Sequence, residues 1–198
     1  MNDPPNRPDK SIVLVGLMGV GKSTVGRRLA KKLKMKFLDA DEEIERAAGM
    51  KIAEIFDRHG EAHFRDGERR VIARLVGGPP RVIATGGGAF INEETRRLIL
   101  ERCIAIWLDA EIEVLATRVS RGRDRPLLRG QDPLAVLAGL AERRNPIYAE
   151  AHLIVRSATG PHDEVVARIV SALAESGALN FDDSESSPGR DRPGDCPG

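Results

Sequence analysis

The sequence lacks the features that mark several large classes of protein. Only 4% of its 198 residues are aromatic, too few for the stacking platforms that bind single-stranded nucleic acid. The 31 Lys and Arg residues are balanced by 30 Asp and Glu residues, so the formal net charge is +1 and no overall field attracts polyanions or anionic lipid. No uninterrupted apolar run approaches the roughly 18 residues that a membrane-spanning helix needs. We therefore expect neither a nucleic-acid partner nor a membrane partner.

Cysteine is also scarce. The chain has two cysteines, Cys103 in an apolar run and Cys196 near its end. They are too few for a cysteine metal cluster or a disulfide framework, so plain thiols are expected. The first ten residues, MNDPPNRPDK, are polar and rich in proline, and they lack the apolar core of a secretory signal. These absences favour a soluble, cytoplasmic protein.

Short apolar runs alternate with helical patterns, and apolar residues make up 41% of the chain. Strands are predicted at 11–15, 36–38, 82–85, 104–108 and 153–155, where the runs are short and rich in β-branched residues. Helices are predicted from Lys22, at 42–48, at 52–76 with a break near Gly60, at 92–102, at 112–119 and at 162–175. Strands that alternate with helices predict an α/β fold with a parallel sheet, and the length suits one domain.

Three segments fall outside this alternation. Residues 1–9 and 180–198 are rich in polar residues, proline and charge, and they are predicted to be a disordered arm and a disordered acidic tail. Residues 121–132, RGRDRPLLRGQD, hold four arginines, two glycines and one proline, with too few apolar residues to pack as an element. They are predicted to form a mobile lid. The folded domain is therefore expected to span 10–179.

The most specific motif is a phosphate-binding loop. Residues 16–23 read GLMGVGKS and match G-x-x-x-x-G-K-[ST] between a buried strand and an amphipathic helix, which is the context that the motif requires. Its glycines let backbone N–H groups converge on phosphate oxygens at the positive end of the helix. Lys22 would reach the β- and γ-phosphates, and the Ser23 hydroxyl would bind Mg²⁺. The alternative is a glycine-rich turn that binds no nucleotide.

The loop alone does not tell how the nucleotide is used. The chain has no Asn-Lys-x-Asp stretch, which argues against a GTPase switch that reads guanine. Residues 104–109, IAIWLD, superficially match the apolar strand and acidic metal ligand of an ATPase motor. Asp109 is better explained as a strand-end residue that caps the following helix.

Two carboxylates follow the second strand, within FLDAD. If the strand continues to Asp41, Asp39 and Asp41 face the same side. One could then orient Mg²⁺ through water, and the other could accept a proton from a hydroxyl nucleophile. Ligands gather at this edge of a parallel sheet, beside the phosphate loop. The alternative, that Asp41 only caps a helix beginning at Glu42, has equal weight on this motif alone.

Glycines and arginines complete the pattern. Residues 85–89, TGGGA, follow the third strand at the same edge, where glycines permit close approach of the backbone to a small ligand. Arg65 in HFRD and Arg144 before Asn-Pro are candidates for forked contacts with a carboxylate. Taken singly, the glycines are better explained as a flexible turn and each arginine as a solvated surface charge.

Taken together, these motifs resemble those of the shikimate kinase family, a member of the P-loop proteins related to nucleoside-monophosphate kinases. The resemblance runs from about 10 to 179 and rests on the order and spacing of GLMGVGKSTVGRRLA, FLDADEEIE, FRDGE, IATGGGAF, RPLL and ERRNPIY. It implies a three-layer αβα fold with a five-stranded parallel sheet in the order 2-3-1-4-5, a mobile lid and a monomeric protein.

The resemblance also implies roles for individual residues. It makes Asp41 the base that contacts the shikimate hydroxyl, places Asp39 in the Mg²⁺ shell with Ser23, and lets Arg125 of the lid reach the transferring phosphate. Catalysis would fall to Asp41, Lys22 and Arg125. The residues implied to hold ATP are Gly19, Val20, Gly21, Lys22, Ser23, Thr24, Arg118, Arg125 and Pro161, and those implied to hold shikimate are Asp41, Arg65, Gly86, Gly87, Gly88 and Arg144, with Arg143 as an adjacent alternative.

The implied activity is transfer of a phosphoryl group from ATP to the 3-hydroxyl of shikimate, a step toward chorismate and the aromatic amino acids, with Mg²⁺ as cofactor. Two alternatives stay open. A related small-metabolite kinase, for instance one acting on gluconate, would keep the phosphate loop but need not keep the other motifs together. A nucleotide-dependent regulator would bind ATP without phosphorylating either small molecule, and its expected sign is loss of Asp41 or of the lid arginine. Both residues are present.

Overall fold

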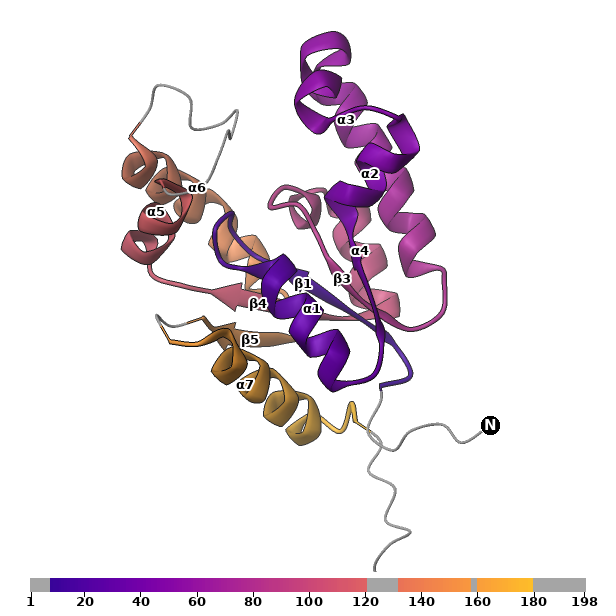
Figure 1. Ribbon diagram of the computed structural model, residues 1–198, viewed down its shortest axis with the longest axis vertical. Coiled ribbons are helices and arrows are strands. Elements are labelled where there is room, and N and C mark those ends of the chain that lie inside the picture. Colours follow the sequence, from indigo (N-terminus) through magenta and orange to yellow (C-terminus); the bar gives the residue numbers. More distant parts are fainter. Residues whose placement is uncertain (1–7, 121–131, 158–159, 180–198) are drawn as a thin grey trace, which may run out of the picture.

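The fold is built on a parallel β-sheet of five strands (Figure 1). The computed structural model of the protein describes residues 8–120, 132–157 and 160–179, so the predicted arm, lid and tail lie wholly or largely outside it. The strands run in the order β2-β3-β1-β4-β5, which confirms the predicted class and strand order. Their bounds are β1 Ser11–Val15, β2 Lys36–Asp39, β3 Arg81–Ala84, β4 Cys103–Asp109 and β5 Leu153–Arg156.

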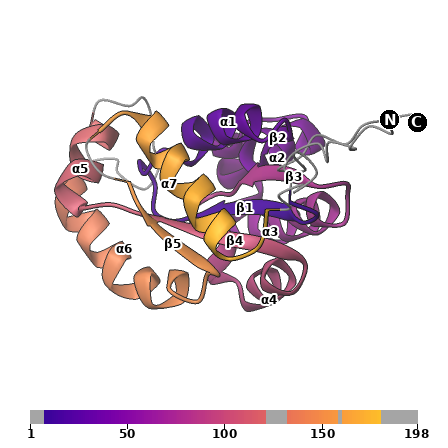
Figure 2. The ribbon, with the colours of Figure 1, turned by 90° about the horizontal axis from the view of Figure 1, so that it is seen from below.

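Helices cover both faces of the sheet and give the three predicted layers. Their bounds are α1 Lys22–Lys32, α2 Ala40–Ala48, α3 Ile52–Val76, η1 Ala89–Ile91, α4 Glu93–Arg102, α5 Ile112–Ser120, α6 Pro133–Tyr148 and α7 His162–Glu175. Helices α1 and α7 lie on one face, whereas α4 and α6 lie on the other (Figure 2). Helix α3 is kinked at Gly60, as predicted. Among the described residues, no helix is long and apolar enough to cross a membrane.

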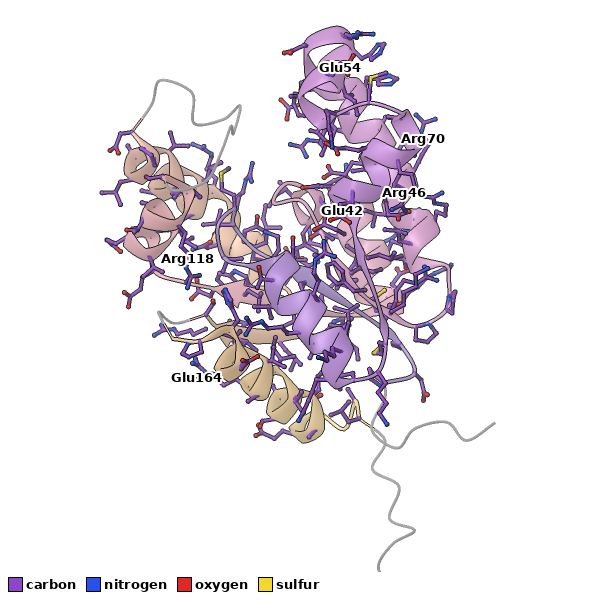
Figure 3. All side chains as sticks on the ribbon, viewed as in Figure 1. Glu42, Arg46, Glu54, Arg70, Arg118 and Glu164 are labelled. Atoms are coloured by element: carbon purple, nitrogen blue, oxygen red, sulfur yellow. The ribbon has the colours of Figure 1, made fainter. Side chains whose placement is uncertain are left out.

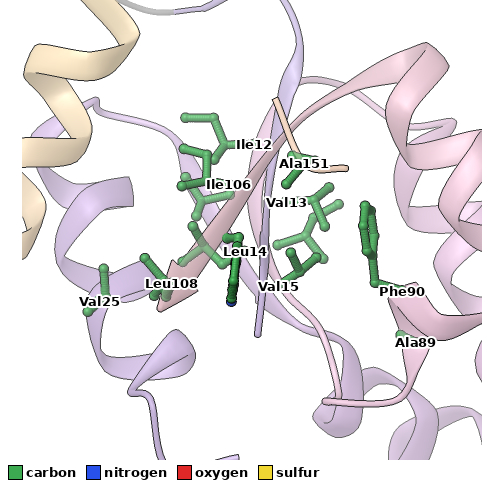
Figure 4. Packing of buried hydrophobic residues seen from close by; sticks show 14 of the residues in the cluster. Ile12, Val13, Leu14, Val15, Val25, Ala89, Phe90, Ile106, Leu108 and Ala151 are labelled. Carbon is green, nitrogen blue, oxygen red and sulfur yellow. The ribbon is translucent and has the colours of Figure 1, made fainter. Parts of the chain in front are cut away.

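The core lies on both faces of the central strand β1. Ile12 and Leu14 point to the side of α1, whereas Val13 and Val15 point to the side of Phe90 in η1 (Figure 4). All four strand residues are at most 1% exposed. A strand that is buried on both faces is apolar at every position rather than at alternate ones, which is why the sequence predicts this strand so clearly.

The strand register brings three strand ends to one level. Asp39 of β2 pairs with Ala84 of β3, and Ala84 pairs with Leu14 of β1. Because β3 lies between the other two strands, the turn that follows it, here called the glycine turn (residues 86–88), lies between Asp39 and Asp41, at and just after the end of β2, and the phosphate loop after β1. The predicted meeting of these motifs at one edge of the sheet is confirmed.

The start of α2 differs from the prediction. Strand β2 ends at Asp39 and α2 begins at Ala40, so Asp41 lies in a helical turn and does not extend the strand. The side chain of Asp39 accepts the N–H of Asp41 at 3.1 Å and serves as the N-cap. The interpretation of Asp41 as the cap of a helix beginning at Glu42 is therefore wrong, because the cap is Asp39.

The sequence patterns do not reveal α6. Its apolar residues are not confined to one face, since Leu134 is 43% exposed, and Pro146 lies inside the helix, where proline usually breaks the hydrogen-bond pattern. The helix start does carry a recognisable signal. Asp132 accepts the N–H groups of Leu134 and Ala135, and Pro133 occupies the first turn. This helix matters because it carries Arg144.

Two helical glycines allow a matched test of the packing. A Cβ on Gly26 of α1 would lie 2.6 Å from the ring of Phe37 in β2, whereas a Cβ on Gly67 of α3 would meet nothing within 4 Å. We expect Gly26→Ala to lower the free energy of unfolding by about 1–3 kcal/mol through overpacking. Gly67→Ala should raise it by up to about 1 kcal/mol through helix propensity. Urea unfolding measures both, and changes of the same sign would contradict this packing.

Candidate active site

The phosphate loop between β1 and α1 has the backbone geometry that its glycines allow. Gly16, Gly19 and Gly21 have φ values of 133°, 83° and 93°, which other residues rarely adopt. A Cβ on Gly16 would also lie 2.5 Å from the carbonyl oxygen of Leu108 in β4. The loop therefore leaves β1 in close contact with β4 and turns into the N-terminus of α1, where backbone N–H groups can bind an anion.

Lys22 belongs to this loop and is 9% exposed. Its Nζ donates hydrogen bonds to the carbonyl oxygens of Gly16 at 2.8 Å and Leu17 at 2.9 Å. These contacts hold the ammonium group against the loop at the positive end of α1. A triphosphate at this place would meet both the backbone N–H groups and the lysine charge, as the motif predicts.

Ser23 and Asp39 join the loop to the end of β2. Ser23 Oγ donates a hydrogen bond to Asp39 Oδ2 at 2.6 Å. A hydroxyl and a carboxylate are hard oxygen ligands, and Mg²⁺ at nucleotide sites uses few such protein groups together with waters and phosphate oxygens. Among the described residues, no group of three or more His, Cys, Asp or Glu could hold a metal ion. The donors fit Mg²⁺ that arrives with a nucleotide.

The glycine turn lies between two carboxylates. A Cβ on Gly86 would lie 3.0 Å from Asp41 Oδ1 and 3.0 Å from Glu68 Oε1. Glu68 is 3% exposed and its Oε2 accepts a hydrogen bond from Arg65 at 2.7 Å, whereas Oε1 has no partner within the described part of the chain. Sequence reasoning missed Glu68, although it follows Arg65 by three residues in FRDGE and so shares its helix face. A Cβ at position 86 would crowd both oxygens, which glycine avoids.

Burial and like charge change the acidity of Asp41. Its pKa is raised to about 6, first by burial and then by the negative charges of Asp39 and Glu68, while Lys22 opposes the change. Burial also raises the pKa of Glu68, and Arg65 opposes it. A carboxylate that titrates near pH 6 is mostly ionised at pH 7 to 8 and is a stronger base than an ordinary aspartate. Asp41 can therefore accept a proton from a hydroxyl group.

Two guanidinium groups lie at the same glycine turn. Arg144 Nη1 donates a hydrogen bond to the carbonyl oxygen of Gly87 at 3.1 Å, and a Cβ on Gly88 would lie 2.6 Å from Arg65 Nη1. Arg65 is ion-paired with Glu68. In the described ranges no carboxylate lies within ion-pair distance of Arg144. Of these two guanidinium groups, Arg144 is therefore the one less neutralised by a carboxylate and the better placed to receive another.

The neighbouring Arg143 points elsewhere. It is exposed, and its Nη1 lies 3.7 Å from the position of a Cβ on Gly139, which is one turn back along α6. No contact joins it to the glycine turn in the described structure. Of the two adjacent arginines, Arg144 is the one at the turn.

One cavity of about 710 Å³ connects the phosphate loop with the acceptor carboxylate. It is bounded by the loop, α1, the end of β2, α2, the start of α3, the glycine turn and α5. Arg118 reaches it from α5, on the opposite side of α1 from Glu42 in α2 (Figure 3). The predicted site residues that line it are Gly19, Gly21, Lys22, Ser23, Thr24, Asp39, Asp41, Gly86, Gly87 and Arg118.

Arg65, Gly88 and Arg144 do not line this cavity. They lie at the glycine turn, which does line it through Gly86 and Gly87. A substrate that contacts both Asp41 and Arg144 must therefore lie along the turn.

Two other predicted residues, Val20 and Pro161, are not among those that line the cavity. Val20 is fully buried and Pro161 is exposed at the start of α7. Asp109 ends β4 with Oδ2 at 3.9 Å from Arg156 Nε, and it does not line the cavity, so a motor-type metal site there has no support. Arg125 lies outside the described residues.

Comparisons with known proteins identify the family. A family model described as shikimate kinase matches residues 18–174. The chain is 59% identical over 169 residues to the shikimate kinase of Caulobacter vibrioides strain NA1000, and the match covers 85% of this chain and 84% of that protein. This chain belongs to the shikimate kinase family. Its activity is accordingly the ATP-dependent phosphorylation of shikimate.

Solved structures agree with this family. The shikimate kinase from Acinetobacter baumannii in complex with shikimate is similar with a TM-score of 0.81 and 38% identity, over 84% of this chain and 94% of that one. A gluconokinase from Sinorhizobium meliloti 1021 is similar with a TM-score of 0.61 over 86% of this chain and 94% of that one. Its identity is 20%, so the likeness is one of fold alone, and the gluconate alternative gains nothing from it.

The raised pKa of Asp41 predicts the acid limb of the pH profile. If ionised Asp41 is the base, kcat/KM for shikimate should fall about tenfold per pH unit below about pH 6. The negative charge of Glu68 raises this pKa, so Glu68→Gln should move the acid limb to lower pH, whatever it does to the plateau. A pH–rate profile of both proteins measures this. A limb that stays in place or moves to higher pH would contradict the coupling.

Proposed function

We propose that the phosphate loop binds ATP and that the glycine turn binds shikimate for the transfer of the phosphoryl group. ATP lies on the loop, with its β- and γ-phosphates at Lys22. Ser23 would hold Mg²⁺ with the support of Asp39, and the bound metal would supply positive charge against the phosphates. Shikimate lies along the glycine turn, with its carboxylate at Arg65 and Arg144 and its 3-hydroxyl at Asp41.

The phosphoryl transfer requires little covalent participation by the protein. Asp41 accepts the proton of the 3-hydroxyl while the new oxygen–phosphorus bond forms and the bond to ADP breaks. Lys22 stabilises the charge that develops on the phosphates, and so does Arg125 of the lid, the role that the family resemblance implies for it. Because the ring is small and rigid, a carboxylate fixed at one end sets the position of the hydroxyl at the other.

A single observation carries these roles: one short turn has a half-buried carboxylate at one end and two guanidinium groups at the other. Gly86 lies against Asp41, and the next two residues lie against Arg144 and Arg65. Binding of ATP alone would not require a carboxylate and two guanidinium groups at a turn next to the phosphate loop. This arrangement supports an acceptor that carries both a carboxylate and a hydroxyl.

Several features stay predictions. The Mg²⁺ requirement rests on the hydroxyl and carboxylate donors at Ser23 and Asp39. The monomeric state follows from the resemblance, and the cytoplasmic location follows from the composition. The bounds of the domain, at 10 and 179, and of the lid, at 121 and 132, rest on the sequence.

The base is tested by a coupled assay of ADP release with and without shikimate, with gluconate as a second acceptor. Wild-type turnover should depend on shikimate and not on gluconate. Asp41→Asn should lower kcat by about 10²- to 10⁴-fold, the usual contribution of a positioned general base. Normal turnover of this variant would be consistent with the proposed reaction but would show that Asp41 is not the base.

The carboxylate contact is tested by two adjacent arginines. Arg144→Ala should raise KM for shikimate by about 10- to 100-fold, because it removes charged hydrogen bonds worth about 1.5–3 kcal/mol. Arg143→Ala is the matched control, one residue away on the same helix but exposed, and it should change KM less than about twofold. Equal effects of the two variants would rule out Arg144 as the specific contact.

A further inference from the structure

Tyr148, the last residue of α6, reaches the glycine turn from within the core. Its side chain is fully buried, and its hydroxyl donates a hydrogen bond to the carbonyl oxygen of Gly87. The same oxygen accepts a hydrogen bond from Arg144 Nη1 at 3.1 Å. One carbonyl group of the turn therefore joins a phenol and a guanidinium that lie one turn apart on the same helix face.

Packing fixes the position of the phenol. Its ring centroid lies 6.5 Å from that of Phe90, in the η1 turn that follows the glycines, and 6.0 Å from that of Trp107 in β4. Both distances are typical of favourable aromatic contacts. Burial raises the pKa of Tyr148, although nearby Arg144 opposes the change. The hydroxyl therefore stays protonated at neutral pH and remains a donor.

Arg144 keeps donors for another partner. A guanidinium carries five N–H groups, and the described residues place no carboxylate within ion-pair distance of this one. Glu68 is close enough to interact with it through charge, but its carboxylate is hydrogen-bonded to Arg65. The guanidinium is held at the turn by its contact with the Gly87 carbonyl oxygen and by the adjacent phenol of Tyr148.

We propose that Tyr148 is a positioning residue for shikimate: its hydroxyl holds the Gly87 carbonyl, and through it the Arg144 guanidinium, in the orientation that receives the substrate carboxylate. This role rests on the proposed function of Arg144 and adds a residue that does not touch the substrate. Without the hydroxyl, the Gly87 carbonyl loses a buried hydrogen bond, and the acceptor that orients the Arg144 guanidinium is less firmly held. Carboxylate binding then weakens, whereas the phosphate loop is unaffected.

The first test is Tyr148→Phe, which removes only the hydroxyl. We expect KM for shikimate to rise about fivefold, the factor that corresponds to one ordinary hydrogen bond, with kcat and KM for ATP within twofold of wild type. Ser176→Ala is the control, because it deletes a hydroxyl that bonds to Leu173 at 2.9 Å at the end of α7. It should change none of these three constants. An unchanged KM for shikimate in Tyr148→Phe overturns the proposal.

The second test repeats Tyr148→Phe in an Arg144→Ala background. If the phenol acts through Arg144, the Tyr148→Phe substitution should not raise KM for shikimate any further in this background. A fivefold rise in both backgrounds overturns the proposal, because Tyr148 would then act independently of Arg144. A wild-type enzyme without shikimate-dependent turnover would instead refute the proposed function.

A third measurement needs no change at Tyr148. The chain contains one tyrosine, so tyrosine labelled with ¹³C at the ζ carbon gives a single NMR signal. Saturation of the wild-type protein with shikimate should shift this signal, because the substrate carboxylate engages the guanidinium that shares the Gly87 carbonyl. A signal that does not move at saturating shikimate overturns the proposal.

Discussion

The parallel pairing of β3 between β2 and β1 is the constraint on which the site depends. Residues in register across three strands leave the sheet at one level, so the segments that follow them must share one edge. The phosphate loop, the glycine turn and the aspartate pair are far apart in the chain. Only this strand order places the glycine turn in the middle, where it can contact groups from both sides.

The site also holds charge that a core would exclude. Asp41 and Glu68 lie close together, and burial raises the pKa of each. Isolated buried carboxylates are costly, and nearby cations offset part of the cost. Arg65 partly neutralises Glu68, and the positive charge of Lys22 opposes the rise in the pKa of Asp41. The result is a carboxylate whose basicity suits proton transfer at neutral pH.

Much of the fold could be predicted because its signals are local. The strand β1 is apolar throughout, the phosphate loop has fixed glycine spacing, and α3 breaks where Gly60 allows it. The site was harder to derive. Glu68 and Tyr148 were missed because their importance depends on contacts with the glycine turn, which a linear pattern does not contain. Helix α6 was missed because its apolar residues are not confined to one face and because its sequence contains Pro146, a residue type that usually ends a helix. Arg144 was one of two candidate arginines in the sequence, the family resemblance added its role as a carboxylate contact, and the structure places it at the turn.

The start of α2 illustrates a different limit. Whether a strand ends at Asp39 or at Asp41 depends on one capping hydrogen bond, and neighbouring carboxylates compete for that role. The sequence places both aspartates at the edge of the sheet but cannot tell which of them caps the helix. The structure assigns the cap to Asp39 and leaves Asp41 facing Gly86.

The most direct measurement is a crystal structure of the protein with shikimate, ADP and Mg²⁺ bound together. The ring should lie along the glycine turn, with its carboxylate on Arg144, its 3-hydroxyl within hydrogen-bond distance of Asp41, and the ADP phosphates on the phosphate loop. A ring bound with its carboxylate away from Arg144, or with Asp41 out of reach of the 3-hydroxyl, would contradict the assignment of these groups.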